Sequence, residues 1–445
     1  MRSIDGLLLC DVTQGWSVSG GGIGSYIRRK QAWISQHSDA RHLLVVPGEE
    51  DRIVENGRFL RAEIRSPSLP HSPNYRFLLR NGAARAVFEQ YRPDLIETFD
   101  PYNLPWSALK YRRRNPATTV IAGYHTDFPR AHIGEFFRHD FPWFGSGMPR
   151  LSARIADAYS GHLYRRFDHV FGLGSDSVKR LRALGVKHVE RMPLGADLSQ
   201  FKPARRNVGF RRSLGVADDA PLLVYAGRLD REKRVAKVWE AFKLLPPELG
   251  AHLLILGQGK WRDERIADGT NGVLHMPGYL DNREALGEAL ASSDIYVSAH
   301  PYETFGMSIV EAQAAGLPIV GVDGGAMIDR VPEGTGLLGP VDDAGAMAAN
   351  IRKIWHGSRA AMGEAGRALV TERFTWDRTF DTLFNRIYPH AFAARDERLA
   401  ARKSGLLDIV SRGGASRGPS GARPENSGPP VTRDMGGVEA PHMKQ

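Results

Sequence analysis

The sequence contains a single cysteine, Cys10, so the chain cannot form an internal disulfide. One free thiol fits a reducing compartment. Cys10 stands in the apolar run LLLC, and we expect it to be a small core residue of a first buried strand. No group of cysteine and histidine residues has the spacing of metal ligands, so the sequence predicts no metal site.

Long apolar runs are also absent. A membrane-spanning helix needs about 18 or more consecutive apolar residues, and none is predicted. The opening stretch MRSIDGLLLCDVTQ lacks the apolar core and cleavage site of a signal peptide, which favours a cytoplasmic location. At 445 residues the chain exceeds one ordinary core, so we expect two domains of roughly 150–200 residues.

Acidic residues are fewer than basic ones, with 50 Asp and Glu against 60 Lys and Arg, a net charge of +10. Such an excess suits nucleic acid, an anionic membrane face or phosphorylated substrates, and it is equally compatible with simple solubility. The absence of zinc-finger spacing and of an RNP-type aromatic motif argues against nucleic acid.

Short apolar runs alternate with helical segments along most of the chain, which predicts an α/β fold with parallel, helix-covered sheets. In such sheets ligands bind beyond the carboxyl ends of the strands. Ser175 is the expected N-cap of a helix after the fifth strand. The expected strands are Leu7–Val12, His42–Pro47, Asp94–Glu97, Thr118–Ala122, His169–Leu173, Leu222–Tyr225, His252–Leu256, Gly272–Met276, Asp294–Ser298 and Ile319–Val322.

The alternation restarts after Phe201-Lys202-Pro203, where we place a domain boundary. The predicted domains are residues 1–200 and 201–375. An amphipathic helical segment follows at 376–400. Residues 404–445 are rich in Gly, Pro, Ser and Arg and are expected to form a disordered tail.

A glycine-rich loop, Ser19–Gly24, follows the first strand and precedes a helix expected to begin near Ser25. Strand, glycine loop and helix are the general parts of a phosphate-binding site. The spacing matches neither a dinucleotide fingerprint nor a Walker loop, and a structural tight turn is the alternative.

His125 follows the strand Thr118–Ala122 and is flanked by Thr126 and Asp127, which makes it a candidate site residue or a structural histidine. The next segment, Phe128–Phe171, is dense in aromatic and basic residues. It suits contact with an acceptor or with an anionic membrane. Amphipathic helices packed on the sheet are the alternative.

The stretch Tyr302–Gly325 contains two carboxylates, Glu303 in a loop and Glu311 in the helix that follows. Gly306 allows close backbone approach at the start of that helix. A helix N-terminus binds anions, and a carboxylate accepts hydrogen bonds from sugar hydroxyls. This stretch therefore predicts a site for a ligand with phosphates and hydroxyls.

Arg228 and Lys233 lie on either side of the turn that follows the strand Leu222–Tyr225. Such a turn can place two cations over one anionic group, for which a diphosphate is the natural ligand. Two solvated basic residues in a charged loop are the alternative.

Four elements in this order, GGGIG, HTDFP, GRLDREK and ETFGMSIVE, resemble the retaining glycosyltransferases of family 4. That family has the GT-B fold, two facing Rossmann-like domains with a cleft between them. The resemblance covers about residues 7–390. The segments DPYNLPW and GYHTDFP are most similar to bacterial enzymes that use mannosyl or related hexosyl donors.

The resemblance implies a nucleotide-sugar donor in the cleft. Arg228 and Lys233 would stabilise the leaving diphosphate, Glu311 would hold the ribose, and Glu303 the hexose hydroxyls. The remaining implied contacts are backbone amides of Phe305, Gly306 and Met307 at the sugar or distal phosphate, Gly21 and Gly22 at the phosphates, His125 at the sugar, and Gly278 and Tyr279 at the base. The helix near Phe374–Tyr388 would cross back onto the first domain.

The implied reaction moves a hexose to a glycan or lipid-linked acceptor by same-face attack, without a metal or another cofactor. GDP-mannose is the leading donor and a UDP-hexose the second. Arg234 departs from the pattern, since many family members have glycine there. A GT-B sugar-nucleotide epimerase and a non-enzymatic sugar-binding module are the alternatives, and the presence of both glutamates and both cations argues against the second.

Overall fold

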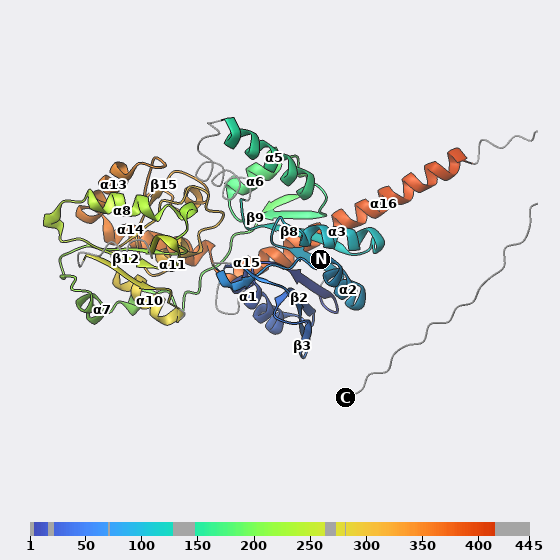
Figure 1. The fold of residues 1–445 in the computed structure, drawn as a ribbon, viewed down its shortest axis with the longest axis horizontal. Helices are drawn as coiled ribbons and strands as arrows, with labels where there is room; N and C mark the ends of the chain where they lie inside the picture. The colour runs from blue at the N-terminus through green and yellow to red at the C-terminus, as the bar shows by residue number, and fades with distance from the viewer. Residues whose placement is uncertain are drawn as a thin grey trace, which may run out of the picture. The chain divides into compact units, whose positions relative to one another are not determined.

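The computed structural model describes residues 4–16, 22–69, 72–127, 147–262, 273–280 and 282–413. The chain up to Leu399 belongs to one compact unit, and a separate unit starts at Ala400. The first unit contains an eight-stranded sheet and a six-stranded sheet, and Figure 1 labels some of their strands. We call residues 1–200 the first half and residues 201–375 the second half.

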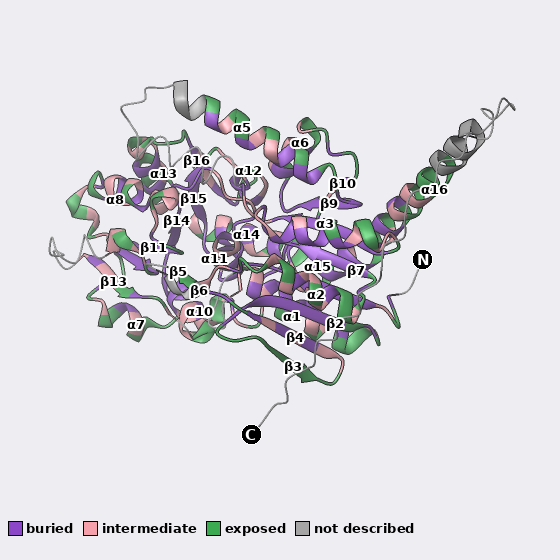
Figure 2. Ribbon diagram, turned by 45° about the vertical axis from the view of Figure 1, so that its right-hand side comes forward, coloured by how far each residue is buried: buried purple, intermediate pink, exposed green. Residues whose placement is uncertain are grey.

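The eight-stranded sheet has the order β10-β9-β8-β7-β1-β2-β4-β3 and is parallel except for β3, which is antiparallel to β4. Its central strands are buried at every residue, as apolar runs in a parallel sheet should be, and they are purple in Figure 2. The strands are β1 (Leu8–Val12), β2 (Arg41–Gly48), β3 (Arg52–Asn56), β4 (Phe59–Arg65), β7 (Leu95–Thr98), β8 (Thr119–Tyr124), β9 (His169–Gly172) and β10 (Val189–Arg191). A separate two-stranded sheet joins β5 (Ser68–Leu69) and β6 (Ser72–Arg76).

The described residues of the first half form the helices α1 (Gly22–His37), α2 (Asn81–Tyr91), α3 (Leu104–Arg114), α5 (Gly147–Tyr164) and α6 (Ser175–Ala183). Two expected helix starts were wrong. Helix α1 begins at Gly22 rather than near Ser25, because the glycines form a first turn whose amides need no intrahelical partner. The N-cap of α6 is Gly174, not Ser175, because the Ser177 hydroxyl accepts from the Gly174 amide at 3.1 Å.

A network of charged side chains lies fully buried between α1 and the first sheet. Lys30 Nζ donates to Asp11 Oδ1 at 2.6 Å and to Glu97 Oε2 at 2.9 Å, and all three side chains have no exposed surface. The hydroxyl of Tyr26 donates to Glu97 Oε1 and that of Tyr388 to Oε2, each at 2.9 Å. A buried ion pair is tolerated only when its remaining valences are satisfied, and these hydroxyls satisfy those of Glu97.

The six-stranded sheet has the order β13-β12-β11-β14-β15-β16 and is parallel throughout. Its order reverses at β11, which lies between β12 and β14, so the loops that leave β11 and β14 meet at a switch point. The strands are β11 (Leu222–Ala226), β12 (His252–Leu256), β13 (Leu274–Gly278), β14 (Ile295–Val297), β15 (Ile319–Val322) and β16 (Gly336–Gly339).

The second half has four short helical turns, η3 (Pro203–Arg205), η4 (Arg231–Lys233), η5 (Pro247–Leu249) and α12 (Met327–Arg330), among its described residues. Its longer helices are α7 (Val208–Ser213), α8 (Val235–Lys243), α10 (Arg283–Ser292), α11 (Met307–Ala314), α13 (Ala344–His356) and α14 (Arg359–Arg373).

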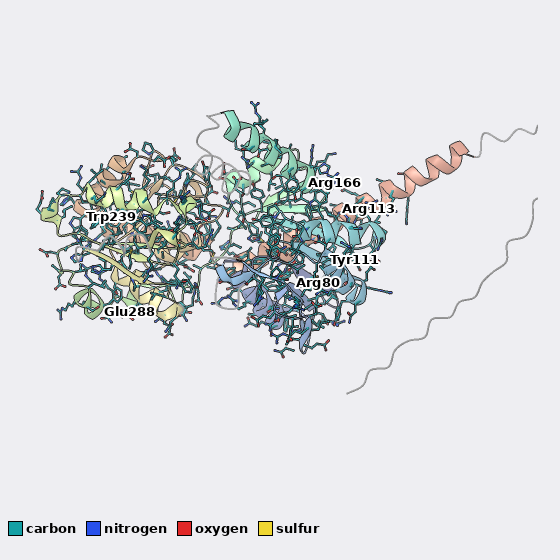
Figure 3. All side chains as sticks on the ribbon, in the orientation of Figure 1. Arg80, Tyr111, Arg113, Arg166, Trp239 and Glu288 are labelled. Atoms are coloured by element: carbon teal, nitrogen blue, oxygen red, sulfur yellow. The ribbon has the colours of Figure 1, made fainter. Side chains whose placement is uncertain are left out.

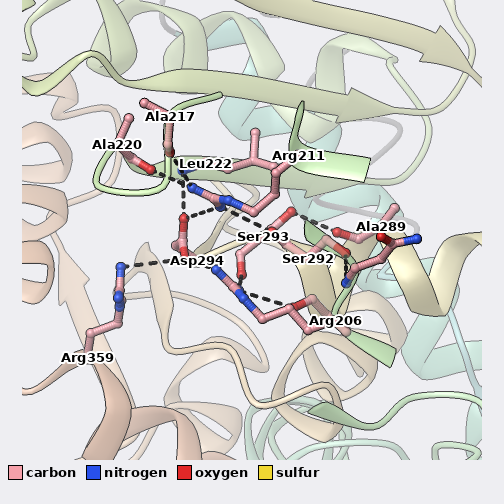
Figure 4. Close-up of polar contacts among 12 residues, drawn as sticks. Arg206, Arg211, Ala217, Ala220, Leu222, Ala289, Ser292, Ser293, Asp294 and Arg359 are labelled. Carbon is pink, nitrogen blue, oxygen red and sulfur yellow. Dashed lines mark hydrogen bonds and ion pairs between the residues drawn. The ribbon is translucent and has the colours of Figure 1, made fainter. Parts of the chain in front are cut away.

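Asp294 fixes the edge of this sheet at which β11 and β14 begin (Figure 4). Its Oδ2 accepts from the Leu222 amide at 2.9 Å and from Arg211 Nη1 at 2.7 Å, and its Oδ1 accepts from Arg206 Nη2 at 3.0 Å. Asp294 is 5 % exposed, so these cations compensate a buried charge. The loops that follow β11 and β14 leave the opposite ends of these strands.

The chain ends in three consecutive helical segments, α15 (Trp376–Thr382), the π-helical η6 (Leu383–Ile387) and α16 (Tyr388–Gly413). Phe384 stacks on Trp33 of α1 with ring centroids 4.4 Å apart, so this segment packs on the first half. Helix α16 continues through residues 404–413, where a disordered tail was expected. The preceding stretch RLAARK consists of strong helix formers, and the helix runs on from it into these residues. The rest of the expected tail lies outside the described residues.

Cys10 has no exposed surface within β1, which confirms the expected core position. None of the helices in the described ranges combines the length and the apolar content that crossing a bilayer requires.

Candidate functional site

The loops that follow β11 and β14 bring Lys233 and Glu303 together. Lys233, at the end of η4, donates from Nζ to Glu303 Oε2 at 3.1 Å. Burial tends to raise the pKa of Glu303, but the charges of Lys233 and His300 and hydrogen bonds from Lys233 and the Gly306 amide lower it to about 2. Glu303 is therefore an ionised acceptor at neutral pH.

Gly306 places the first turn of α11 beside Glu303. It adopts φ +85°, and a Cβ there would lie 2.6 Å from Ile309 Cδ1, so the position requires glycine. Gly306 is the N-cap of α11, and Met307 is its first residue. The free amides and the positive dipole end of this helix therefore adjoin the Lys233–Glu303 pair.

Phe305 contributes to the core as well as to this loop. Its side chain is 2 % exposed, and its ring lies 4.2 Å from the guanidinium carbon of Arg330. Its carbonyl oxygen accepts from Arg330 Nε at 3.0 Å. The buried Arg330 thus anchors the loop between Glu303 and α11.

Sequence reasoning missed His300, which supports the turn that carries Lys233. His300 is 4 % exposed, and its Nδ1–H donates to the Glu232 carbonyl at 2.6 Å. Burial, and then the charge of Lys233, lower the pKa of His300 to about 4, so the ring is neutral at pH 7. Its place between β14 and Glu303, in the sequence AHPYE, was the available signal.

Arg228 pairs with Asp230 and Glu232 in its own loop, and its side chain is 59 % exposed. The Glu232 carbonyl is also the partner of His300. A joint action of Arg228 and Lys233 on one diphosphate remains a prediction.

Arg234 adopts a left-handed conformation, with φ +51° and ψ +37°. Glycine adopts this backbone conformation without strain, so a glycine after Lys233 would be favourable. The arginine side chain pairs with Asp342, and its guanidinium lies 5.7 Å from the Tyr302 ring. These contacts hold the turn despite the strained backbone.

His125 reaches this region from the end of β8 in the first half. Its ring packs against Phe99, Tyr26 and Phe171, with centroids 5.1, 5.8 and 5.8 Å away. Its Nε2 is buried without a hydrogen-bond partner, and burial lowers the pKa of the ring to about 3. His125 is thus neutral, and its carbonyl accepts from Thr304 Oγ1 at 2.7 Å.

Gly22, at the start of α1, also approaches the second half. A Cβ on Gly22 would lie 3.9 Å from Met307 Cγ, so the glycine loop ends beside the first turn of α11. Gly21 lies outside the described residues. Strand, glycine and helix therefore occur here as the sequence predicted, next to the N-terminus of a second helix.

Helix α12 links the two halves beside the site. Arg330 Nη2 donates to the Leu173 carbonyl at 2.9 Å, and Asp329 Oδ1 accepts from the Ser175 hydroxyl at 2.7 Å. A small cavity next to this contact is lined by residues of both halves, among them Tyr124, Asp127, Glu303 and Thr304.

Glu311 lies on α11 and is 5 % exposed. Arg283 donates from Nη2 to its Oε1 at 2.7 Å. Burial raises the pKa of Glu311, and Arg283 opposes that rise. Gly278, with φ +99°, ends β13, and Tyr279 follows it with 48 % of its surface exposed.

The described residues contain no group of three His, Cys, Asp or Glu side chains placed to hold a metal ion. Lys233, Arg283 and the exposed Arg228 are among the cationic groups at the site.

Two family models match the chain. The model described as Glycosyltransferase Family 4 matches residues 20–200, and the model described as Glycosyl transferases group 1 matches residues 209–369. One match falls in each half.

Curated relatives show the same similarity. A GDP-mannose-dependent alpha-mannosyltransferase of Mycolicibacterium smegmatis is 30 % identical over 300 residues, which cover 67 % of this chain and 74 % of the relative. A GDP-mannose-dependent alpha-(1-6)-phosphatidylinositol dimannoside mannosyltransferase of Mycobacterium tuberculosis is 28 % identical over 305 residues, covering 65 % and 76 %.

The fold is similar to that of a sucrose-phosphate synthase from Thermosynechococcus elongatus. The TM-score is 0.69 at 20 % identity, with 87 % of this chain and 100 % of the other covered. Together with the two parallel sheets, this match confirms the predicted α/β fold of GT-B type, with two Rossmann-like parts.

Proposed function

Because the chain belongs to glycosyltransferase family 4, we propose that it transfers a hexose from a nucleotide-sugar donor to a glycan or lipid-linked acceptor. The observation that carries this proposal is the Lys233–Glu303 pair at the N-terminus of α11. A lysine and free helix amides suit phosphates, and an ionised carboxylate suits sugar hydroxyls. These groups adjoin one another at the switch point of the second sheet.

GDP-mannose is our leading donor. The mycobacterial relatives named above are both described as GDP-mannose-dependent, which supports this choice. A UDP-hexose is the second candidate, since Lys233, Glu303 and the helix amides contact parts that all nucleotide hexoses share.

We assign roles to the residues by their surroundings. Lys233 and the first turn of α11 contact the diphosphate, and Arg228 joins them when it leaves its own-loop carboxylates. Glu303 accepts hydrogen bonds from the hexose, and Glu311 from the ribose. The residues of the first half, Gly21, Gly22 and His125, face the phosphates and the sugar, while Gly278 and Tyr279 lie at the base.

The proposed reaction retains the anomeric configuration. The acceptor oxygen forms a bond to the anomeric carbon on the face from which the phosphate departs. The bond from that carbon to the phosphate oxygen breaks, and the acceptor proton passes to the leaving phosphate. Lys233 and the helix amides stabilise the negative charge that develops there, so the proposal includes no metal and no further cofactor.

We further propose that the enzyme works at the inner face of the cell membrane. Helix α5 exposes Leu151 by 53 % and Ile155 by 63 %, with the exposed Arg154 between them. Arg166 and Arg113 add exposed positive charge on the same half (Figure 3). An apolar and basic surface suits the headgroup region of anionic lipids. Residues 128–146, the more aromatic part of the expected contact segment, lie outside the described residues.

The test of function measures nucleoside diphosphate release from GDP-mannose and UDP-glucose, with and without a membrane extract as acceptor. A transferase releases the diphosphate faster with acceptor. An epimerase converts the donor without it, and a binding module leaves the donor intact; either result overturns the proposal. A thermal-shift panel of nucleotide sugars identifies the donor first, because a bound ligand stabilises the folded state by mass action.

A further inference from the structure

Arg283 has a fixed position beside Glu311. It is the first residue of α10, after the N-cap Asn282, whose Oδ1 accepts from the Glu284 amide at 2.8 Å. Its Nη2 donates to Glu311 Oε1 at 2.7 Å. Its guanidinium carbon lies 4.8 Å from the centroid of the Phe201 ring, and Phe201 has no exposed surface. A carboxylate at one end and a buried ring beneath hold the planar group in one orientation.

The Arg283 guanidinium is half-exposed and has more donors than Glu311 uses. A guanidinium has five N–H donors in a planar fork, and Glu311 takes one of them. The Arg283 side chain is 47 % exposed, whereas that of Glu311 is 6 % exposed. Arg283 is therefore the accessible member of the pair, and its other donors are candidates for contact with a group attached to a ribose that Glu311 holds.

A second arginine, from the first half, interacts electrostatically with Arg283. Arg28, on α1, has its guanidinium carbon 5.7 Å from the Trp16 ring centroid. Burial, and then the positive charge of Arg283, lower the pKa of Arg28, while Tyr279 acts in the opposite direction. The charges of Arg28 and Arg283 therefore act on one another across the two halves. Like charges that repel one another are stabilised by a ligand that offers electron-rich acceptor atoms.

We propose that Arg283 reads the base of the donor nucleotide and selects guanine over uracil and adenine. This inference rests on the proposed function, in which Glu311 holds the ribose. Guanine has two neighbouring acceptors, N7 and O6, on one edge, and these match two donors of an arginine fork. Adenine has an acceptor beside a donor, and uracil has a single carbonyl at the corresponding edge, so neither forms the paired contact.

The test compares binding of GDP, UDP and ADP to the full chain by titration calorimetry. Wild type is expected to bind GDP about 10- to 100-fold more tightly than UDP, the range that one bidentate arginine–guanine contact provides. In Arg283→Gln the GDP:UDP ratio falls close to one. Arg283→Lys keeps the charge beside Glu311 but not the fork, and its ratio of GDP to UDP affinity also falls close to one. Glu311→Gln weakens all three nucleotides alike, because they share the ribose.

The ratio separates base reading from a structural role, since damage to the pocket weakens every nucleotide. An unchanged GDP:UDP ratio in both Arg283 variants overturns the inference. So does a wild type that prefers UDP or ADP, although the proposed glycosyl transfer then stands. A wild type that binds none of the three diphosphates overturns the proposed function as well.

Discussion

The Thr304 hydroxyl donates a hydrogen bond to the carbonyl oxygen of His125 at 2.7 Å. Thr304 follows Glu303 in the second half, and His125 follows the last residue of β8 in the first half. The bond therefore ties the loop of one sheet to the end of a strand in the other. The candidate site exists only where the two halves meet, so residues from either half can alter it.

Lys233→Ala is expected to reduce transfer by about 100-fold or more, because the charge that forms on the leaving phosphate loses a preorganised cation. Steady-state kinetics with saturating donor measure the loss. Lys237→Ala is the matched control: Lys237 pairs with Glu240 at 2.6 Å, on α8 and away from Glu303. Normal turnover of Lys233→Ala would contradict its role at the phosphate.

His300→Leu is expected to lower kcat/KM about 10-fold or more with a small change in Tm. The Glu232 carbonyl loses its donor, and the turn that carries Lys233 loses a support. His300→Asn keeps an N–H near the position of Nδ1 and should recover most of the activity. Equal losses in both variants would show that the hydrogen bond is not what matters.

The pH dependence of stability should reveal His125. Burial lowers its pKa from 6.5 to about 3, so between these values the unfolded chain binds a proton that the folded chain does not. The contribution of the neutral His125 ring to the free energy of unfolding is complete above pH 6.5. It is lost as the pH falls toward 3, by about 1.4 kcal/mol per pH unit. Urea denaturation at pH 6.5, 5.5 and 4.5 should show a flatter slope in His125→Phe. Parallel slopes would refute the assignment.

Lys30→Met is expected to destabilise the protein by about 3–5 kcal/mol, because Asp11 and Glu97 would remain buried without their cation. Tyr388→Phe removes one hydrogen bond to Glu97 and should cost about 1–3 kcal/mol. Urea denaturation measures both. A smaller effect of Lys30→Met than of Tyr388→Phe is the outcome that would contradict the buried network.

Sedimentation with anionic liposomes tests the surface of α5. The double variant Leu151→Ser, Ile155→Ser should bind about 10-fold less, since each side chain loses its apolar contact with lipid. Binding of wild type should also weaken at high salt. The control pair Val208→Ser, Leu244→Ser removes comparably exposed apolar groups from the second half, at 45 % and 58 % exposure. If the control reduces binding equally, α5 is not the contact.

The parallel strands were predictable because strands buried on both faces are continuous apolar runs. His252–Leu256 and Ile319–Val322 were predicted with the observed bounds. Strand β4 was missed although FLRAEIR alternates in burial, because its polar positions form ion pairs such as that between Arg61 Nε and Glu63 Oε1 at 2.8 Å. A search for continuous apolar runs assigns such an alternation of apolar and charged residues to a loop.

Residues of the candidate site were predicted where they belong to motifs, as for Lys233 and Glu303. His300 and Arg283, and Lys30 of the buried network, belong to no such motif. Lys30 stands in the sequence RRK, where it resembles a solvated residue, and its partners lie far along the chain at positions fixed only by topology. The spacing of residues along the sequence does not reveal contacts that form only when the chain folds.

The buried network of the first half is complete only after Tyr388 has been synthesised. Residues 1–200 leave the ribosome long before Tyr388 is translated, yet Glu97, in the interior of that half, receives one of its hydrogen bonds from Tyr388. Domains generally begin to fold as they emerge. A first half that has emerged before Tyr388 is translated keeps only Lys30 as the donor to Glu97 Oε2. A chain that stops before Tyr388 therefore keeps a buried carboxylate with one hydrogen bond fewer.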